Sequence, residues 1–140
     1  MKRGIFIKKS FVHHLCIQTN TYTESLKFYT DVLGFKVVQE SPDFHGRNFN
    51  TWIQLGDFYI ELQTGKQNEM LSDVNTNSQG LVHFCLWVED LKSEVSRLHE
   101  LGTEFLLKNN EFIYHVENGS LCKIKAPEGT IVELRNNKGI

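Results

Sequence analysis

The sequence predicts an α+β fold built from two copies of one β-α-β-β-β unit in tandem. A strand that carries a histidine recurs at His14 and His83, and a later strand that carries a glutamate recurs at Glu61 and Glu133, each after about 70 residues. Between each histidine and its glutamate, apolar residues at helical spacing are followed by runs of strand character. A duplicated unit explains both observations.

The first unit is expected to contain one helix and four strands. Apolar residues in its helix follow helical spacing, and Gly34 provides the stop. Gly56-Asp57 joins the last two strands as a hairpin. The expected elements are a strand at 11–18, a helix at 24–33, a strand at 35–40, a loop at 41–46, and strands at 49–55 and 58–63.

The second unit repeats this order. Gly102 falls in step with Gly34, and residues 126–129 form a turn between the last two strands. Residues 109–116 are either a loop or a short extra strand. The other expected elements are a strand at 81–88, a helix at 91–101, and strands at 104–107, 121–125 and 130–135.

We expect one domain over residues 1–140, with module one at about 11–64, a polar linker at about 65–79 and module two at about 80–136. Hydrophobic residues make up 40%, charged residues 23%, and the formal net charge is −2, so nothing favours a nucleic acid or an anionic membrane as partner. No apolar stretch is long enough to span a bilayer. The apolar part of residues 1–9 is too short for a signal peptide, and we interpret this segment as a surface arm or a frayed strand.

Three cysteines, Cys16, Cys85 and Cys122, lack the spacing of a metal finger and cannot all pair within the chain. A reduced, cytoplasmic protein is the economical interpretation. Cys16 and Cys85 each follow a candidate histidine by two residues and share its face. They either bring a thiolate near a metal or serve as small apolar residues that line a cleft, and the second role is the more common.

Strand parity indicates which side chains meet, because successive residues point to opposite faces of a sheet. The apolar residues of each strand are expected to pack on the helices, so the alternate residues face a concave side. By this rule His13 falls on the wrong face. The four residues that could converge on the concave side are His14, Glu61, His83 and Glu133. Five others share this parity and are either pocket walls or plain packing: Gln18, Tyr59, Gln63, Trp87 and Arg135.

Two imidazoles and two carboxylates suit a divalent ion such as zinc, nickel, manganese, cobalt or iron, with positions left for water or substrate. A buried acid on a sheet face needs a partner for its charge, and a metal is one such partner. The alternative is a hydrogen-bonded His–Glu pair in each module. Repetition of the pair favours the metal, because chance would have to place both residue types correctly twice.

At these residues the chain resembles the vicinal oxygen chelate superfamily, which contains glyoxalase I, bleomycin and fosfomycin resistance proteins, methylmalonyl-CoA epimerase and extradiol dioxygenases. The segment SLKFYTDVLGF at 25–35 is similar to the signature of its first helix, and GLVHF at 80–84 and PEGTIVEL at 127–134 are similar to signatures of its second half. The likeness covers roughly residues 11–136. It is specific for the fold and much less so for the reaction, since one fold supports many chemistries.

The resemblance implies that the paired βαβββ modules form an open, cupped mixed sheet around a metal in a cleft. It implies that His14 and Glu61 occupy the first two ligand positions and that the full set of His, Glu, His and Glu is that of glyoxalase I. It also implies a homodimer, and the site could close within one chain or between two swapped chains. Glutathione-dependent members usually carry arginine and asparagine where this chain has Gln18 and Gly65, which leaves the thiol open.

The implied chemistry begins with a substrate whose neighbouring hydroxyl and carbonyl oxygens chelate the ion, which acidifies the adjacent C–H. A carboxylate then takes the proton and returns it to the neighbouring carbon. Glu133 is preferred as the base and Glu61 as ligand or return acid. We therefore expect an isomerase or lyase of glyoxalase type, similar to lactoylglutathione lyase. The alternatives are an epimerase, an antibiotic-modifying thiol transferase, or a metal-free sequestering protein of the bleomycin-resistance type.

Overall fold

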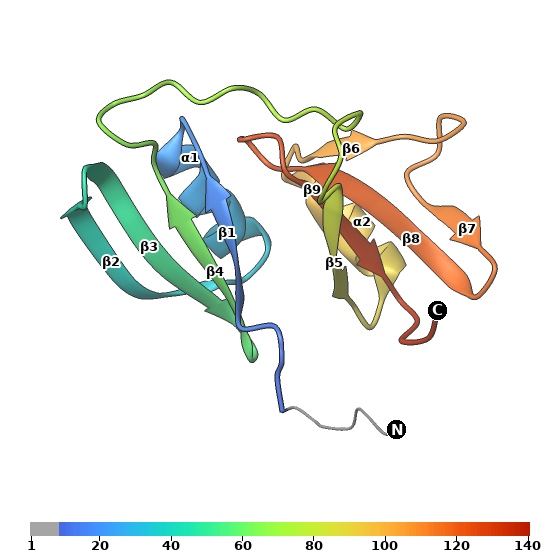
Figure 1. Ribbon diagram of the computed structural model, residues 1–140. Coiled ribbons are helices and arrows are strands. Elements are labelled where there is room, and N and C mark those ends of the chain that lie inside the picture. The colour runs from blue at the N-terminus through green and yellow to red at the C-terminus, as the bar shows by residue number, and fades with distance from the viewer. Residues whose placement is uncertain (1–8) are drawn as a thin grey trace, which may run out of the picture.

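The computed structural model describes residues 9–140, so the arm expected at 1–9 lies outside the described residues except for its last position. Module one consists of β1 (His14–Gln18), α1 (Tyr22–Lys27), the π-helical turn η1 (Phe28–Val32), β2 (Lys36–Phe44), β3 (Arg47–Leu55) and β4 (Phe58–Gln63). Module two consists of β5 (His83–Trp87), α2 (Leu91–Glu100), β6 (Glu104–Leu106), β7 (Tyr114–Val116), β8 (Gly119–Lys125) and β9 (Ile131–Arg135). Figure 1 shows the two modules side by side, joined by a linker that passes over one end of both.

Each module forms its own mixed sheet. The strand order is β1-β4-β3-β2 in module one and β5-β9-β8-β6 in module two, where β7 also pairs with β8. In both sheets the first strand runs parallel to the last, and the register of this pair is equivalent: Cys16 lies opposite Glu61, and Cys85 lies opposite Glu133. The α+β class and the two tandem modules predicted from the sequence are confirmed.

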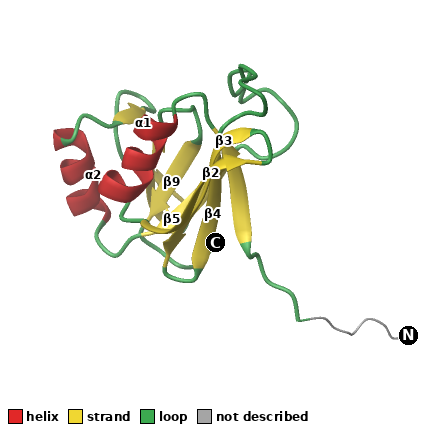
Figure 2. Ribbon diagram, turned by 90° about the vertical axis from the view of Figure 1, so that its left-hand side faces the viewer, coloured by secondary structure: helices red, strands yellow, loops and turns green. Residues whose placement is uncertain are grey.

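The two helices lie on the same side of the sheets, and among residues 9–140 no helix covers the other face of either sheet (Figures 1 and 2). The inward-facing strand residues and the helices form one core cluster that draws on both modules, as Ile17 and Ile60 from one and Leu98, Val132 and Leu134 from the other illustrate. Each such fully buried aliphatic side chain contributes about 1.5–3 kcal/mol relative to exposure. The sheet faces that carry the candidate ligands are therefore held in place from behind by this core.

Polar contacts also join the modules. The hydroxyls of Ser25 and Tyr29 each donate a 2.7 Å hydrogen bond to the carboxylate of Glu128, in the turn between β8 and β9. The guanidinium of Arg97 on α2 donates a 2.8 Å hydrogen bond to the backbone carbonyl of Val32. These bonds fix the helical segment of module one against both the turn and the helix of module two.

The loop predicted at 41–46 is wrong over most of its length, because β2 continues through Pro42 to Phe44. β2 is an edge strand, and an edge strand can contain a proline since one side of its backbone needs no hydrogen-bond partner. The turn is confined to His45 and Gly46, both with left-handed φ, at 48° and 84°. Pro42 therefore does not mark a loop, because it lies in a strand at the edge of the sheet.

Other boundaries differ less. The helix predicted at 24–33 is α1 followed by η1, and it ends where Gly34 adopts a φ of 86°, just as α2 ends at Gly102 with a φ of 77°. Within 109–116 the short extra strand is present as β7. The strands predicted to begin at 11 and 81 begin instead at His14 and His83.

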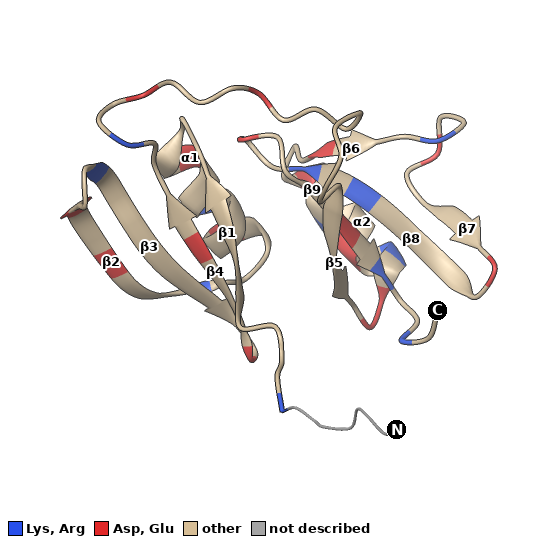
Figure 3. Ribbon diagram, in the orientation of Figure 1, with Lys and Arg blue, Asp and Glu red and all other residues tan. Residues whose placement is uncertain are grey.

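Figure 3 shows both signs of charge on each module, consistent with the near-balanced composition. Over residues 9–140, no helix combines the length and the hydropathy that crossing a membrane would require.

Candidate functional site

The structure brings the four candidate ligands together as two pairs. His14 Nε2 lies 3.6 Å from Glu61 Oε1, and His83 Nε2 lies 3.1 Å from Glu133 Oε1. Both pairs arise in the same way: the glutamate sits on the last strand of the module, two residues beyond the partner of the histidine in the parallel register, and therefore on the same face. We call His14 with Glu61 half-site one and His83 with Glu133 half-site two.

The half-sites differ in how far water reaches them. The side chains of His14 and His83 are 35% and 33% exposed, whereas Glu61 is 21% and Glu133 only 9% exposed. Glu133 Oε2 also lies 3.6 Å from the thiol of Cys85, which donates to it. Half-site two thus holds the more enclosed carboxylate.

Each pair has the spacing of two neighbouring ligands on one ion. Nitrogen and oxygen ligands at about 2.1 Å from a divalent metal stand about 3.0 Å apart at a right angle and about 3.4 Å apart in a tetrahedron, close to the 3.1 and 3.6 Å observed. The four ligands do not converge within one chain, however: among residues 9–140, no three His, Cys, Asp or Glu side chains are close enough to hold a metal together. Each half-site supplies two ligands.

Aromatic rings surround half-site one. His14 packs edge-on against Trp52, with ring centroids 4.8 Å apart, and His13 stacks on Tyr59 at 5.3 Å with an interplanar angle of 17°. His13 Nδ1 lies 2.9 Å from His14 Nδ1. The sequence prediction for His13 was therefore wrong, since β1 begins only at His14 and strand parity does not extend to the residue before it.

Half-site two is basic where half-site one is aromatic. Trp52 lies opposite Glu61 in module one, and the corresponding position opposite Glu133 is Lys123. Beside it Arg135 is half-buried, and its Nε is enclosed with no hydrogen-bond partner among the described residues. Neither Trp52 nor Lys123 was identified from the sequence, although the predicted hairpin at Gly56-Asp57 would have placed Trp52 opposite Glu61. The predicted turn at 126–129 is one position out of register with the observed pairing of Lys123 and Glu133.

The five predicted pocket residues are spread over both concave faces. Tyr59 takes part in the aromatic cluster, and Gln18 accepts a 2.9 Å hydrogen bond from Arg47. Trp87 is 45% exposed and lies under the ammonium of Lys138, 4.5 Å from the ring centroid. The last two, Gln63 and Arg135, are half-buried partners of Gln18 and Trp87 in the parallel registers.

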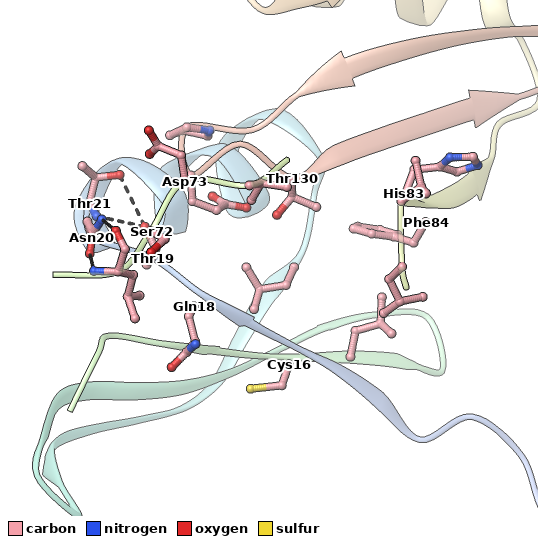
Figure 4. Close-up of a pocket in the computed structure, with 18 residues that line it drawn as sticks. Cys16, Gln18, Thr19, Asn20, Thr21, Ser72, Asp73, His83, Phe84 and Thr130 are labelled. Atoms are coloured by element: carbon pink, nitrogen blue, oxygen red, sulfur yellow. Dashed lines mark hydrogen bonds between the residues drawn. The ribbon is translucent and has the colours of Figure 1, made fainter. Parts of the chain in front are cut away.

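A cavity of about 460 Å³ lies where the modules meet, between β1, linker residues 71–74, the start of β5 and the turn at 127–130. Figure 4 shows the Phe84 ring directed toward this cavity and the His83 ring directed away from it. Of the four candidate ligands only His83 is among the lining residues. Neither glutamate of the half-sites lines it, although Cys16 and Gln18 of the concave face do.

The cysteines beside the half-sites are neutral thiols. Burial raises the pKa of both Cys16 and Cys85 to about 11, and the negative charges of Glu61 and Glu133, respectively, add to this effect. A neutral thiol is a weak donor and a poor nucleophile. This favours the expected role as small residues lining the cleft.

Comparison with known proteins gives a consistent result. A family model described as the glyoxalase/bleomycin resistance protein/dioxygenase superfamily matches residues 11–134. The uncharacterized protein YwkD of Bacillus subtilis (strain 168) is 28% identical over 93 residues, which are 66% of this chain and 73% of YwkD.

Several solved structures share the fold. A glyoxalase family protein from Enterococcus faecalis superimposes with a TM-score of 0.76 at 21% identity, covering 89% of this chain and 96% of the other. Leishmania major glyoxalase I, described as trypanothione-dependent, superimposes with a TM-score of 0.71 at 21% identity, covering 93% of this chain and 88% of the other. TnmS3, an antibiotic binding protein from Streptomyces sp. CB03234, superimposes with a TM-score of 0.67 at 16% identity, covering 93% of this chain and 98% of the other. At these identities the likeness establishes the fold, which enzymes and a binding protein share.

Proposed function

Since this chain belongs to the glyoxalase/bleomycin resistance protein/dioxygenase superfamily, we propose that it is a metal-dependent isomerase or lyase of glyoxalase type. Its substrate is a small molecule with vicinal oxygens, such as the hemithioacetal of a 2-oxoaldehyde and a thiol. The observation that carries the proposal is the pair of His–Glu half-sites at equivalent register, with 3.6 and 3.1 Å between the possible ligand atoms.

The complete centre forms in a homodimer, where half-site one of one chain faces half-site two of another. Two observations support this arrangement: the ligands do not gather within the described part of one chain, and the sheet faces that carry them have no helix over them. The four side chains His14, Glu61, His83 and Glu133 supply two nitrogens and two oxygens. This set fits a divalent ion such as zinc, nickel, manganese, cobalt or iron and leaves positions for two substrate oxygens.

A bound ion supplies Lewis acidity, which polarises a substrate carbonyl and makes the neighbouring C–H more acidic. Glu133 takes that proton, which is then returned to the adjacent carbon. Its 9% exposure supports this role, because a carboxylate shielded from water keeps the proton from exchanging with solvent during transfer. Glu61, at 21% exposure, acts as a ligand or as the returning acid.

The two half-sites suit different ends of the substrate. Trp52 and Tyr59 offer flat apolar surface, whereas Lys123 and Arg135 suit a carboxylate. The thiol is therefore anionic, and its charge lies on the side of Lys123 and Arg135. Glutathione-dependent members carry arginine and asparagine at two positions where this chain has Gln18 and Gly65. The three free cysteines fit a reducing, cytoplasmic location.

A metal-free sequestering protein is the second candidate. The fold likeness to an antibiotic binding protein and the aromatic rings around His14 favour it. An epimerase or an antibiotic-modifying thiol transferase would use the same four ligands and differ in substrate. Metal content separates the first candidate from the sequestering protein, and substrate assays separate the enzymes from one another.

The test is metal analysis of the protein purified without chelators, followed by methylglyoxal isomerisation assays with several thiols and several added metals. We expect one ion per chain, dimers in solution, and turnover that His14→Gln and His83→Gln abolish. His115→Gln is the matched control, since His115 lies on β7 outside both half-sites and bonds to Ser120. A folded dimer that binds none of these ions and turns over none of these substrates would refute the proposal.

A further inference from the structure

Two adjacent histidines at the start of β1 are in contact through their rings, and only one of them is a candidate ligand. We propose that His13 is a positioning residue that fixes the ring orientation and the tautomer of His14, so that His14 Nε2 is free to bind the ion. This inference rests on the proposed function, because it assigns a role within half-site one.

The geometry separates the two nitrogens of His14. Nε2 faces Glu61, whose Oε1 is 3.6 Å away, and Nδ1 faces His13 Nδ1 at 2.9 Å. Nε2 is therefore placed to bind an ion together with Glu61, and Nδ1 is in contact with His13. A metal-bound histidine generally donates the N–H of its other nitrogen to a nearby acceptor, which sets the ring orientation.

The proton count defines what His13 must do. A histidine that binds metal through Nε2 carries its proton on Nδ1, because a ligand nitrogen must have its lone pair free. That Nδ1–H can donate to His13 Nδ1 only if His13 is neutral and carries its own proton on Nε2. Two N–H groups facing each other at 2.9 Å would repel, so one ring must donate and the other accept. With an ion on His14 Nε2, His14 is the donor and His13 the acceptor.

His13 is itself held in place. Its ring stacks on Tyr59 at 5.3 Å and meets Trp52 edge-on at 6.1 Å, while the His13 and His14 rings are perpendicular at 87°. Because the His13 ring already packs on two aromatic rings, it loses little conformational entropy when it accepts the hydrogen bond. His13 can therefore orient His14 although it lies outside the regular strand.

Module two has no counterpart to His13. The residue before His83 is Val82, which is 48% exposed and has no group that accepts a hydrogen bond in its side chain. In the part of the chain that the structure describes, His83 makes no ring contact or hydrogen bond on its other nitrogen. Among the described residues, a histidine that can accept a hydrogen bond from the ligand histidine is thus found in half-site one and not in half-site two. Val82 occupies the equivalent position in module two and serves as the control.

The test compares three variants of the protein by chelator-competition titration with Co²⁺ and Ni²⁺. His13→Phe keeps the aromatic stacking but removes the acceptor, and His13→Gln restores an acceptor without the ring. We expect His13→Phe to weaken metal affinity about 10–100-fold, the usual effect of removing such a partner. We expect His13→Gln to recover most of that loss and Val82→Ala to match the wild type.

Two spectroscopic readouts report the contact itself. In the Zn²⁺-loaded wild type the His14 Nδ1 proton should give a slowly exchanging imidazole signal in proton NMR, and His13→Phe should lose it. The visible absorption of the Co²⁺ protein should change in His13→Phe and not in Val82→Ala. Circular dichroism and thermal unfolding establish that each variant is folded.

Equal affinity and equal spectra in wild type and His13→Phe would overturn the inference. Equal losses in His13→Phe and His13→Gln would also overturn it, since they would assign the effect to the histidine ring and not to the hydrogen bond. If the wild type itself binds no ion, the proposed function fails and not this step alone. If His13→Phe does not fold, the wild type still decides the test, because absence of the His14 Nδ1 proton signal from the Zn²⁺-loaded protein would overturn the inference.

Discussion

The Tyr29 hydroxyl of module one donates a 2.7 Å hydrogen bond to the Glu128 carboxylate of module two. Tyr29 is fully buried, and Glu128 accepts a second bond from Ser25, which is also fully buried. The turn between β8 and β9 is therefore attached to the helical segment of the other module at two points. Because β9, which carries Glu133 of half-site two, follows this turn directly, the two bonds link half-site two to module one.

Removing one donor should destabilise the protein measurably. We expect Tyr29→Phe to lower the free energy of unfolding by about 1.5–3 kcal/mol, the contribution of a hydrogen bond to a charged acceptor. The melting temperature should fall by roughly 5–10 °C for a chain of this size. Urea denaturation measures the first value and calorimetry the second.

Ser25→Ala tests the second donor, and the double variant tests whether the two act together. Because both bonds end on one carboxylate, the two losses should not add. Tyr114→Phe is a control, since the Tyr114 hydroxyl is not among the donors to Glu128. Wild-type stability in Tyr29→Phe would show that the bond contributes nothing to the junction of the modules.

The same tyrosine predicts a loss of stability at alkaline pH. Burial, followed by the charge of Glu128, raises the pKa of Tyr29 well above its ordinary value of 10.0. Above pH 10 the unfolded chain releases this proton and the folded chain does not, so the unfolded state is favoured progressively. The stability due to Tyr29 is complete below pH 10 and is lost as the pH rises toward the pKa of the folded state.

Denaturation curves between pH 8 and pH 11.5 measure this dependence. The free energy of unfolding should fall more steeply above pH 10 in the wild type than in Tyr29→Phe. Tyrosinate absorbance near 295 nm should appear for Tyr29 only as the protein unfolds. Parallel slopes for the two proteins would contradict the assignment.

Glu133→Gln tests the proposed base. The amide has nearly the shape of the carboxylate but cannot accept the substrate proton, so kcat should fall at least about 100-fold. Metal analysis should still find an ion in the folded variant, because His14, Glu61 and His83 remain. Glu100→Gln, at the exposed end of α2, is the matched charge control. Unchanged turnover in Glu133→Gln would remove its role as base.

Strand parity predicted the two His–Glu pairs because it depends only on local geometry. His14 and Glu61 share a face of one sheet, and His83 and Glu133 share a face of the other, as alternation requires. Gly34 likewise predicted a helix stop, since its φ of 86° is one that glycine adopts without strain. These features follow from a few neighbouring residues.

Other features depend on information that a local pattern does not contain. His13 precedes the first residue of β1, so alternation gives no orientation for it. Pro42 was assigned to a loop because an isolated strand gives no sign of whether it lies at an edge. The placement of the two sheets relative to each other depends on the shared core and on bonds such as Tyr29 to Glu128. The spacing of His and Glu in the sequence therefore could not indicate whether four ligands meet in one chain.

The difference between the half-sites predicts which substrates the protein prefers. Lys123 lies opposite Glu133 on the same sheet face and is half-buried, so its ammonium can reach the space in front of half-site two. Lys123→Gln should raise KM about tenfold for hemithioacetals of an anionic thiol such as 3-mercaptopropionate. This is less than the full contribution of a charge-assisted hydrogen bond, since Lys123 is partly solvated. For the neutral thiol 2-mercaptoethanol, KM should stay within about twofold because no charge pair is lost.

Lys92→Gln serves as the control, since Lys92 is an exposed residue of α2 on the opposite side of the sheet. The preference for the anionic thiol should also weaken with added salt in the wild type and not in Lys123→Gln, because salt screens an exposed charge pair. If Lys123→Gln raises KM equally for both thiols, its effect is structural. The basic side of the site would then have no part in selecting the substrate, and the thiol would have to be recognised by the aromatic side around Trp52.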